Sequence, residues 1–269
     1  MDWDALYCVV DDYCNAFEAT GRSRMIADGE RRRKRSSQLS LSEMLTIIIG
    51  FHESGYRAFK RYYLERQATH HREFPNLISY NRFIEWMPSL TGPLAAYLMS
   101  RFGEIPGIAF VDSTALSMCG NKRIRRNRVF QGQAKMSRTM IGWIFGFKVH
   151  LIINDRGELL SIRVTQGNVD DRSPVRGMCG NLIGKQFGDK GYISTILTQD
   201  LLQQGVHLVT GLRKNIREKL LPLWDKLMLR KRSLIETVID QLKNISQIQH
   251  TRHRSPANDL VNILAGLVA

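Results

Sequence analysis

Three acidic residues are spaced along the sequence so that their side chains could act together. Asp112 follows the apolar run "GIAFV", and Asp189 follows the stretch "NLIGKQFG". Glu236 lies in "RSLIETVIDQLK", on the polar side of a pattern that predicts an amphipathic helix. Carboxylates at two strand ends and on one helix can converge on a pair of hard cations, which prefer oxygen ligands. Two such cations can hold the attacking and leaving oxygens of a phosphodiester in line.

Each of these acids also has an ordinary structural interpretation. Asp112 could cap the turn after its strand, Asp189 could form an Asx-turn before a glycine, and Glu236 could be a solvated charge. Another acidic pair, Asp170 and Asp171 in "GNVDDRSP", also follows a predicted strand. Its Gly, Asn, Ser and Pro neighbours are typical of a turn and a helix cap, so we interpret this pair as structural or supporting.

An α/β arrangement is needed to bring the three acids together. After Pro106 the sequence predicts, in order, a strand at 107–114, two hairpin strands at 143–154 and 158–168, a short helix after 174, a strand ending at 189, a helix at 194–205, a strand at 206–212 and a long helix at 230–247. A hairpin at the start of an α/β layout favours a mixed sheet with helices on its faces. Ligands of open sheets bind beyond the strand ends, where Asp112 and Asp189 are expected.

The first part of the chain is predicted to be helical. Helices are predicted at 3–20, 40–51, 56–67, 79–87 and 91–103. A serine, Ser40 or Ser42, is placed to cap the second helix. The linker before it contains "RRRKR" at 31–35, which could contact phosphate or form a charged loop. The change of pattern predicts a helical domain at 1–105 and an α/β domain at 106–269.

The chain of 269 residues is strongly basic, with 39 Lys and Arg against 25 Asp and Glu and a net charge of +14. Residues 1–105 carry 14 basic and 13 acidic side chains, whereas residues 106–269 carry 25 and 12. Nearly all of the excess therefore lies in the α/β part, which should face a polyanion. Nucleic acid is favoured, because neutralised phosphates supply most non-specific affinity. The alternatives are a basic surface that only serves solubility, or contact with an anionic membrane.

One segment of the α/β part concentrates the basic residues. Between Ser113 and Asn154 the sequence has eight Lys or Arg and no acid. Such a run can be a solvated surface, but beside the candidate acids it favours contact with a DNA backbone. The candidate phosphate contacts are Lys122, Arg123, Arg125, Arg126 and Arg128.

Several other classes of protein are disfavoured by the sequence. The four cysteines are widely spaced without a C-x-x-C pair, which argues against a disulfide framework or a structural zinc site. None of the seven histidines has an Arg three residues later, as a tyrosine recombinase requires. The start "MDWDALYC" is acidic where a signal peptide is basic, and runs such as "MLTIIIGF" are too short to span a bilayer. We therefore expect a cytoplasmic protein with reduced thiols and no membrane partner.

The motifs together resemble those of a known family. "FVDST", "FGDKGYIS" and "RSLIETVIDQLK" resemble the DDE transposases of bacterial insertion sequences, whose catalytic core is ribonuclease-H-like. The helix matches their signature of Arg, three residues, Glu, six residues and Lys, at Arg232, Glu236 and Lys243. The family's Tyr three positions before the Arg is Leu229 here, a departure that one subgroup shares. That subgroup, insertion sequence 982, is also similar in "GWIFGFKVHLIIN" and "QGNVDDRSP", and the likeness covers essentially the whole chain, most weakly at its start.

The resemblance implies a fold and a set of functional residues. The fold is a ribonuclease-H-like mixed five-stranded sheet with flanking helices, preceded by an all-α domain that binds DNA ends or oligomerises. By this resemblance, Asp112, Asp189 and Glu236 would be the catalytic triad and would bind two Mg²⁺ ions, for which Mn²⁺ could substitute. Arg232 and Lys243 contact substrate phosphate from the helix face that carries Glu236, although Arg232 could simply pair with Glu236 one turn away.

Two further residues are expected near the DNA. By the same resemblance, Tyr192 stacks on DNA or positions it near the cut; the alternative is a core tyrosine. Lys148 and His150 alternate on one strand face, and Lys148 is the better candidate for a role near the acids.

The resemblance implies the function of a DNA transposase. The protein would hydrolyse a phosphodiester at the end of its element, and the freed 3′-OH would then attack target DNA without ATP or a covalent protein–DNA intermediate. The expected partner is double-stranded DNA, at terminal repeats and target, bound by a homodimer in a synaptic complex at the bacterial nucleoid. The alternatives are a ribonuclease-H-like nuclease without strand transfer and an inactive DNA-binding derivative. The family usually continues with a basic tail beyond "LAGLVA", which leaves a truncated chain as an alternative.

Overall fold

The computed structural model describes residues 2–27, 39–70, 72–139, 142–211, 221–249 and 254–269. The chain forms two compact units. The helical unit contains Met1–Ser100, Leu242–Ile248 and His253–Ala269, and the sheet unit contains Arg101–Gln241 and Gln249–Arg252. Among the described residues, no helix is both long and apolar enough to cross a membrane.

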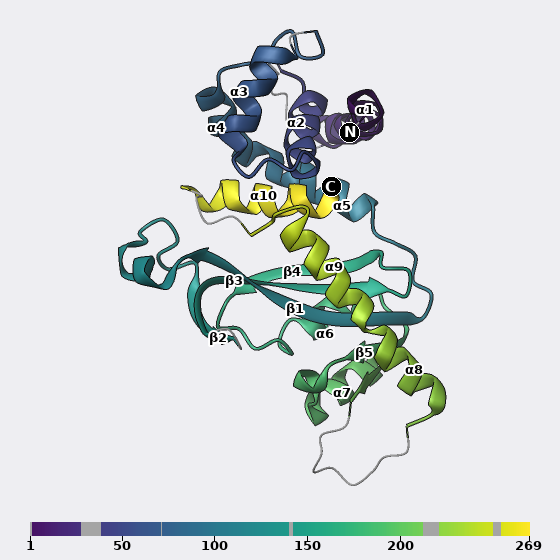
Figure 1. The fold of residues 1–269 in the computed structure, drawn as a ribbon. Coiled ribbons are helices and arrows are strands. Elements are labelled where there is room, and N and C mark those ends of the chain that lie inside the picture. Colours follow the sequence, from purple (N-terminus) through teal and green to yellow (C-terminus); the bar gives the residue numbers. More distant parts are fainter. Residues whose placement is uncertain (1, 28–38, 71, 140–141, 212–220, 250–253) are drawn as a thin grey trace. The chain divides into compact units, whose positions relative to one another are not determined.

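The helical unit consists of helices (Figure 1) whose apolar side chains are largely buried. Its elements are α1 (Trp3–Ala27), α2 (Leu41–Glu53), α3 (Phe59–Thr69), α4 (Tyr80–Trp86), the 3-10 helix η1 (Met87–Leu90), α5 (Thr91–Ser100) and α10 (Pro256–Val268). Helix α2 is the most enclosed of these, since nearly all of its residues are buried. The buried Tyr62 of α3 donates its hydroxyl to the carbonyl of Ile47 in α2 at 3.0 Å, and the buried Tyr63 donates to the carbonyl of Ile78 at 2.7 Å.

Helix α2 begins at a capping box. Ser40 Oγ accepts from the backbone N–H of Glu43 at 3.1 Å, and the Glu43 carboxylate accepts from the backbone N–H of Ser40 at 2.6 Å. The prediction of a serine cap is confirmed, and the cap is Ser40 rather than Ser42. Helix α1 is longer than predicted and ends at Ala27, while the "RRRKR" run at 31–35 lies outside the described residues.

The last helix of the chain belongs to the helical unit. Helix α10 is capped by Ser255 and buries a face rich in Val, Ile and Leu against α2 and α5. The sequence predicted a single boundary between 105 and 106, which assigns α10 to the catalytic part. The structure groups α10 with the N-terminal helices instead, because the apolar side chains of all three helices bury one another there.

In the described part of the sheet unit there is one mixed sheet of six strands. The strands are β1 (Ile108–Cys119), β2 (Lys135–Thr139), β3 (Gly142–Asn154), β4 (Leu159–Gln166), β5 (Gly184–Gly188) and β6 (Val206–Thr210). The helices are η2 (Asn121–Arg126), α6 (Val175–Met178), η3 (Lys190–Tyr192), α7 (Thr195–Gln203), α8 (Leu223–Lys231) and α9 (Ser233–Asn244), of which η2 and η3 are 3-10 helices. The end of α9, from Leu242, belongs to the helical unit. Strand β1 is central, antiparallel to β3 and parallel to β5, and β6 completes the parallel side.

Strand β3 has two partners along one edge. Strand β2 pairs with residues 142–146 of β3, and β4 pairs with residues 147–153. The mixed sheet with flanking helices that the sequence predicted is confirmed, but it has six strands rather than five. The additional strand is β2, whose sequence "KMSRT" is largely exposed and has no apolar alternation to reveal a strand.

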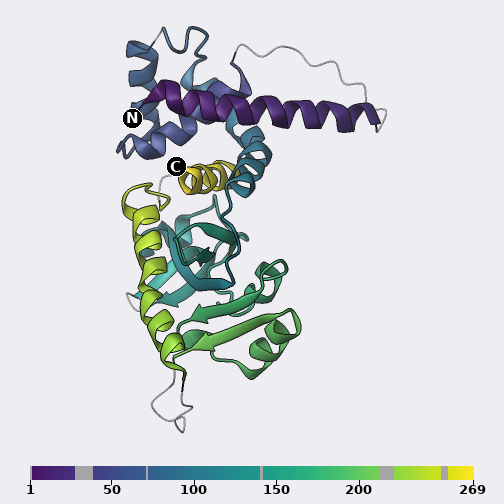
Figure 2. The same ribbon diagram turned by 90° about the vertical axis from the view of Figure 1, so that its right-hand side faces the viewer.

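Helices cover both faces of the sheet (Figure 2). Val111 and Ile152 point to one face, where they pack in a buried cluster with side chains of α6 and α7. Phe110 and Phe187 point to the other face, where the Phe187 ring lies 5.7 Å from the ring of Trp224 in α8. In Figure 2 the yellow-green α8 and α9 lie on one side of the sheet and the green α7 on the other.

Candidate active site

The parallel register of β1 and β5 brings Asp112 and Asp189 onto neighbouring segments. The two strands pair as far as Phe110 opposite Phe187, and each Asp follows its Phe by two residues. Because strand side chains alternate, both acids project to the side that carries the two Phe rings. The prediction that Asp112 closes its strand is wrong, since β1 stays paired with β3 as far as Cys119. What ends before Asp112 is the pairing with β5, whose last pair is Phe110 with Phe187.

Arg232 connects two of the predicted catalytic acids. It lies between α8 and α9, where the single helix predicted at 230–247 is interrupted. Its guanidinium donates from Nη1 to Asp112 Oδ2 at 3.1 Å and from Nη2 to Glu236 Oε1 at 2.6 Å. The i,i+4 pair considered as the ordinary role of Arg232 is therefore present, and the same side chain also ties the helix to the sheet at Asp112.

Asp112 is the most enclosed of the three acids, with a side chain 22% exposed against 57% for Glu236. Burial raises the pKa of Asp112, and the charges of Asp189 and Glu236 also raise it. The backbone N–H of Ser113, which donates to Asp112 Oδ1 at 2.8 Å, and the charge of Arg232 act in the opposite direction on this pKa. Asp112 is thus electrostatically coupled to both other acids, and negative charge accumulates at this point of the sheet.

Asp189 follows β5 directly and begins a tight turn. Its Oδ1 accepts from the backbone N–H of Gly191 at 2.8 Å, at the start of η3. The structural role considered for Asp189 is therefore present. The carboxylate is nevertheless exposed and has more acceptor positions than this one bond uses, so it can also serve a ligand.

The three acids are of the kind that hard divalent cations bind. Asp112 and Glu236 already share one cationic group, the guanidinium of Arg232, so a positive charge between them is favoured. No three His, Cys, Asp or Glu side chains in the described part of the chain are close enough to hold one metal ion together. The acids match a hard divalent cation in ligand type and charge, and in this arrangement the Arg232 guanidinium is hydrogen-bonded to two of them.

Lys148 belongs to a different cluster from the three acids. Asp112 and Ser113 point to opposite faces of the sheet, and Lys148 lies on the Ser113 side. Lys148 Nζ donates to Asp171 Oδ1 at 2.9 Å and to the carbonyl of Val169 at 2.9 Å, while Ser113 Oγ donates to the same Asp171 oxygen at 2.8 Å. Lys148 therefore forms an ion pair with Asp171, in the turn after β4. The sequence predicted a position near the three acids instead.

Tyr192 and His150 are both buried in the sheet unit. Tyr192 is 2% exposed and lies in the core cluster between the sheet and α7, so its ring has no face to offer a base. The stacking role expected for Tyr192 is therefore replaced by the alternative, a core tyrosine. His150 is 0% exposed, and its Nε2 lies 2.8 Å from Thr165 Oγ1. Burial lowers the pKa of His150 to about 4, so the imidazole is neutral at neutral pH.

The predicted DNA-contacting segment forms an exposed basic surface on η2 and the residues after it. All five candidate side chains lie on this segment: Lys122, Arg123, Arg125, Arg126 and Arg128. None of the five forms an ion pair with an acid in the described ranges. Lys243, near the end of α9, is half-buried, and burial lowers its pKa.

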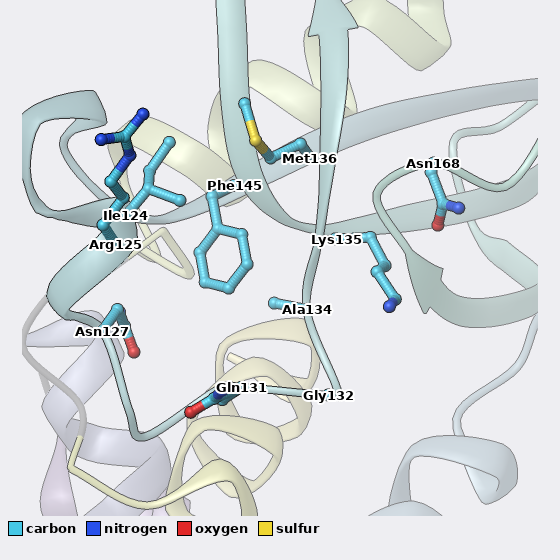
Figure 3. Close-up of a pocket in the computed structure, with 10 residues that line it drawn as sticks. All are labelled: Ile124, Arg125, Asn127, Gln131, Gly132, Ala134, Lys135, Met136, Phe145 and Asn168. Carbon is cyan, nitrogen blue, oxygen red and sulfur yellow. The ribbon is translucent and has the colours of Figure 1, made fainter.

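A hollow that the sequence did not reveal lies beside this basic surface (Figure 3). It has a volume of about 550 Å³ and is lined by residues of η2, β2, β3 and the segments next to them. Phe145 and Met136 contribute apolar surface, and Arg125 and Lys135 contribute positive charge. From the sequence, the apolar run of β3 predicted only a buried strand. The hollow also needs β2, which pairs with one end of β3, and β2 could not be recognised in the sequence.

Comparison with known proteins agrees with the motifs. Residues 102–256 match the family described as Transposase DDE domain. No curated protein matches the chain in sequence. Among solved structures, the chain is similar to one described as a piggyBac transposase synaptic complex with hairpin DNA, with a TM-score of 0.50 and 10% identity over 90% of this chain and 68% of that one. At this identity the similarity concerns the fold alone.

The family match includes all three candidate acids and the whole of the sheet that carries them. It extends over more than half of the 269 residues. The chain therefore belongs to the DDE transposases, a family of polynucleotidyl transferases that act on DNA.

Proposed function

We propose that this DDE transposase cleaves a phosphodiester at the ends of a bacterial insertion sequence of the 982 type and joins the freed 3′-OH to target DNA. Asp112, Asp189 and Glu236 are its catalytic, metal-binding acids. The observation that carries the proposal is the Arg232 guanidinium, which is hydrogen-bonded to Asp112 and Glu236 at once. The register that sets Asp189 beside Asp112 supports it further.

The fold supports the proposal as well. An antiparallel set of β1, β3 and β4 continues into the parallel strands β5 and β6, with helices on both faces. We regard this sheet as ribonuclease-H-like. The helical unit would then bind the DNA ends or oligomerise, as expected for the first part of the chain.

The acids would hold a pair of Mg²⁺ ions, for which Mn²⁺ could substitute. When bound, these ions stabilise negative charge on the attacking and leaving oxygens of the phosphodiester. Arg232, once released from the two carboxylates, would contact the substrate phosphate, and Lys243 would provide a second cation from the same helix. The five cations of η2 and the residues after it would hold the DNA backbone.

The expected partner is double-stranded DNA, bound by a homodimer that brings two element ends together in the bacterial cytoplasm. The net charge of +14, nearly all of it after residue 105, supports a polyanionic partner. The exposure of the basic surface on η2 supports DNA contact by this segment.

The test is cleavage and joining of DNA that carries the inverted repeats flanking the coding region. Asp112→Ala, Asp189→Ala and Glu236→Ala are each expected to abolish Mg²⁺-dependent cleavage and to leave DNA binding largely intact, because the acids hold the metal rather than the DNA backbone. Asp240→Ala, which removes an exposed acid one turn further along α9, is the matched control and should cleave normally.

Two outcomes would change the assignment. If Asp171→Ala loses cleavage while Asp189→Ala retains it, the choice of the second acid is wrong. If the wild-type protein cleaves paired ends but never joins them to target DNA, the protein is a nuclease without strand transfer.

A further inference from the structure

The hollow between η2, β2 and β3 has the chemistry of a nucleotide site. Its lining includes the apolar side chains of Phe145, which is 8% exposed, and Met136, here called the floor, and the cations Arg125 and Lys135 (Figure 3). We propose that this hollow binds an unpaired nucleotide of the DNA substrate, with the base against the floor and the neighbouring phosphates on the cations. This inference rests on the proposed function and adds to it the form that the DNA takes beside the cut.

The polar part of the lining suits the edge of a base. Asn127, Gln131 and Asn168 place three carboxamides around the hollow. A carboxamide offers both donors and an acceptor, so it can pair with the edge of any base without selecting one. The volume of about 550 Å³ falls within the range of roughly 300–1,000 Å³ that is usual for small-molecule sites and is ample for one nucleotide.

The apolar floor continues outward along the β2–β3 hairpin as an exposed stripe. Met136 pairs with Phe145 and Arg138 pairs with Trp143, so the alternation of side chains puts these four on one face. Trp143 is 53% exposed and Met136 is 47% exposed. Bases of single strands stack on exposed aromatic rings with cations beside them. The stripe of Trp143, Arg138 and Met136 is therefore an exposed surface that is continuous with the lining of the hollow.

The charges around the hollow favour nucleic acid over a protein partner. The sequence has no acid between Ser113 and Asn154, so none of the residues from 121 to 146 that line the hollow is acidic. The remaining lining residue, Asn168, is neutral. An apolar patch for a protein partner is typically depleted of charge at its centre. Here cations alternate with apolar side chains, as in sites that hold a strand by its phosphates and its bases.

Contacts within the sheet unit hold the segments that line the hollow in place. Phe130 is 1% exposed, and its ring lies 5.9 Å from that of Phe147 on β3, which fixes the segment between η2 and β2. Asn127 Oδ1 accepts from the backbone N–H of Phe130 at 3.2 Å. At Gly146 an added Cβ would lie 1.8 Å from the carbonyl oxygen of Leu116, so only glycine permits β1 and β3 to approach so closely beneath the floor.

The floor of the hollow and the candidate acids lie on the same face of the sheet. Phe145 and Leu151 are an even number of positions apart on β3, and Leu151 pairs with Asp112. Six residues of a strand span roughly 20 Å. A DNA strand covers that length in about six nucleotides. An unpaired nucleotide in the hollow would therefore lie within about six nucleotides of the phosphate at the acids.

The test compares bulged with paired DNA where cleavage cannot occur. The intact chain is titrated, in EDTA and at fixed ionic strength, into each of two labelled duplexes. One duplex is fully paired, and the other, the bulged duplex, carries one unpaired 2-aminopurine. We expect the bulged duplex to bind roughly tenfold more tightly, as one stacked base should allow. The 2-aminopurine fluorescence should change only in the bulged duplex, because only an unstacked base can enter the hollow.

Variants of the exposed stripe locate the effect. Trp143→Ala combined with Met136→Ala should abolish the preference for the bulge and change the affinity for paired DNA by no more than about twofold, because backbone contacts dominate that affinity. Trp143→Phe should retain the preference. Ile183→Ala removes another exposed apolar side chain of the sheet unit, 65% exposed, and should behave as the wild type.

The outcomes separate this inference from the proposed function. Equal affinity of the wild type for the two duplexes, or an unchanged preference in the double variant, would overturn the inference and leave DNA cleavage by the triad standing. Binding to neither duplex would overturn both. If Trp143→Ala alters the oligomeric state but not the preference for the bulge, the stripe is a contact between copies of the chain and the inference is wrong.

Discussion

At the scale of single residues, the candidate site is organised by the guanidinium that Asp112 and Glu236 share. Two carboxylates that converge on one point repel each other, and a third, Asp189, is near enough to raise the pKa of Asp112. Arg232 compensates part of this repulsion with two charge-assisted hydrogen bonds. Arg232 therefore supplies a positive charge between these two acids.

Replacement of Arg232 should strengthen metal binding by the DNA-free protein. Arg232→Gln removes the competing cation and leaves the acids in place, so the affinity for Mn²⁺ should rise by roughly tenfold, on the scale of one hydrogen bond to a charged group. Titration followed by the electron paramagnetic resonance of Mn²⁺ measures this without any cleavage. The same variant should bind the DNA substrate less tightly, because it removes a cation that would contact phosphate.

Arg230→Gln is the matched control for this prediction, since Arg230 is an exposed arginine at the end of α8. It removes the same charge two residues away and should leave Mn²⁺ affinity nearly unchanged. An equal increase in both variants would mean that only the general field of the basic surface matters. No change in Arg232→Gln would mean that the ion binds without displacing the guanidinium.

At the scale of elements, polar contacts on the sheet face opposite Asp112 hold β1 in place. Ser113 and Lys148 both donate to Asp171, and His150 bonds to Thr165 on β4. These contacts link β1, β3, β4 and the turn after β4. The strand that carries the first acid is thereby held in place by residues that take no part in the proposed chemistry.

His150 should make the sheet unit sensitive to mild acid. Burial lowers its pKa from 6.5 to about 4, so the unfolded chain binds a proton in a range where the folded protein does not. The contribution of His150 to the free energy of unfolding is therefore full above pH 6.5. It decreases as the pH falls from 6.5 toward 4, by up to about 1.4 kcal/mol for each pH unit. Urea unfolding between pH 7 and pH 4 should show a flatter dependence in His150→Gln.

His207→Gln provides the comparison, because His207 is exposed on β6. Its unfolding free energy should keep the wild-type dependence on pH. If His150→Gln also keeps that dependence, another group titrates in this range, and His150 is not the source of the acid sensitivity.

The elements that the sequence predicted correctly are those with an apolar period of their own. Strands β1, β3 and β4 and helix α2 alternate or repeat regularly enough to be recognised locally. Strand β2 has no such period, because it is a short exposed partner at an edge of β3. Arg232, at the interruption between α8 and α9, bonds to Asp112, 120 residues earlier, and no local pattern contains that contact.

At the scale of the whole molecule, positive charge is concentrated in the residues that also carry the acids. Residues 106–269 hold nearly all of the net charge of +14, and the exposed run on η2 is its densest part. Such a distribution attracts DNA before any specific contact forms and makes its binding dependent on salt.

Salt dependence should reveal how much η2 contributes. Arg125→Gln combined with Arg126→Gln should lower the slope of log affinity against log salt concentration by about 0.9 for each phosphate that the variant no longer neutralises. Fluorescence anisotropy with a paired duplex at several salt concentrations measures that slope. The same charge change at Arg172 and Arg176, beside α6 on the other face of the sheet, should have a smaller effect; equal effects would exclude a special role for η2.

The candidate site was predictable from the sequence only in part. The spacing of Arg232, Glu236 and the two aspartates could be recognised, since the motif lies in the sequence itself. The position of Lys148 could not, because a shift of one residue along a strand moves a side chain to the opposite face. The burial of Tyr192 depends on the packing of η3 against the sheet and α7, which no local pattern contains. Which face carries Asp112 depends on pairings between distant strands, and those appear only in the folded sheet.

The discontinuity of the helical unit has a consequence for synthesis. Residues 101–241 are inserted between α5 and the returning segments, and α10 covers apolar surface of α2 and α5. A ribosome releases α2 and α5 long before α10 exists, so that apolar surface stays without its cover while the sheet unit is being made. Domains fold as they emerge. The sheet unit can therefore fold first. The helical unit begins to be translated earlier but can reach its final stability only after α10 has been made.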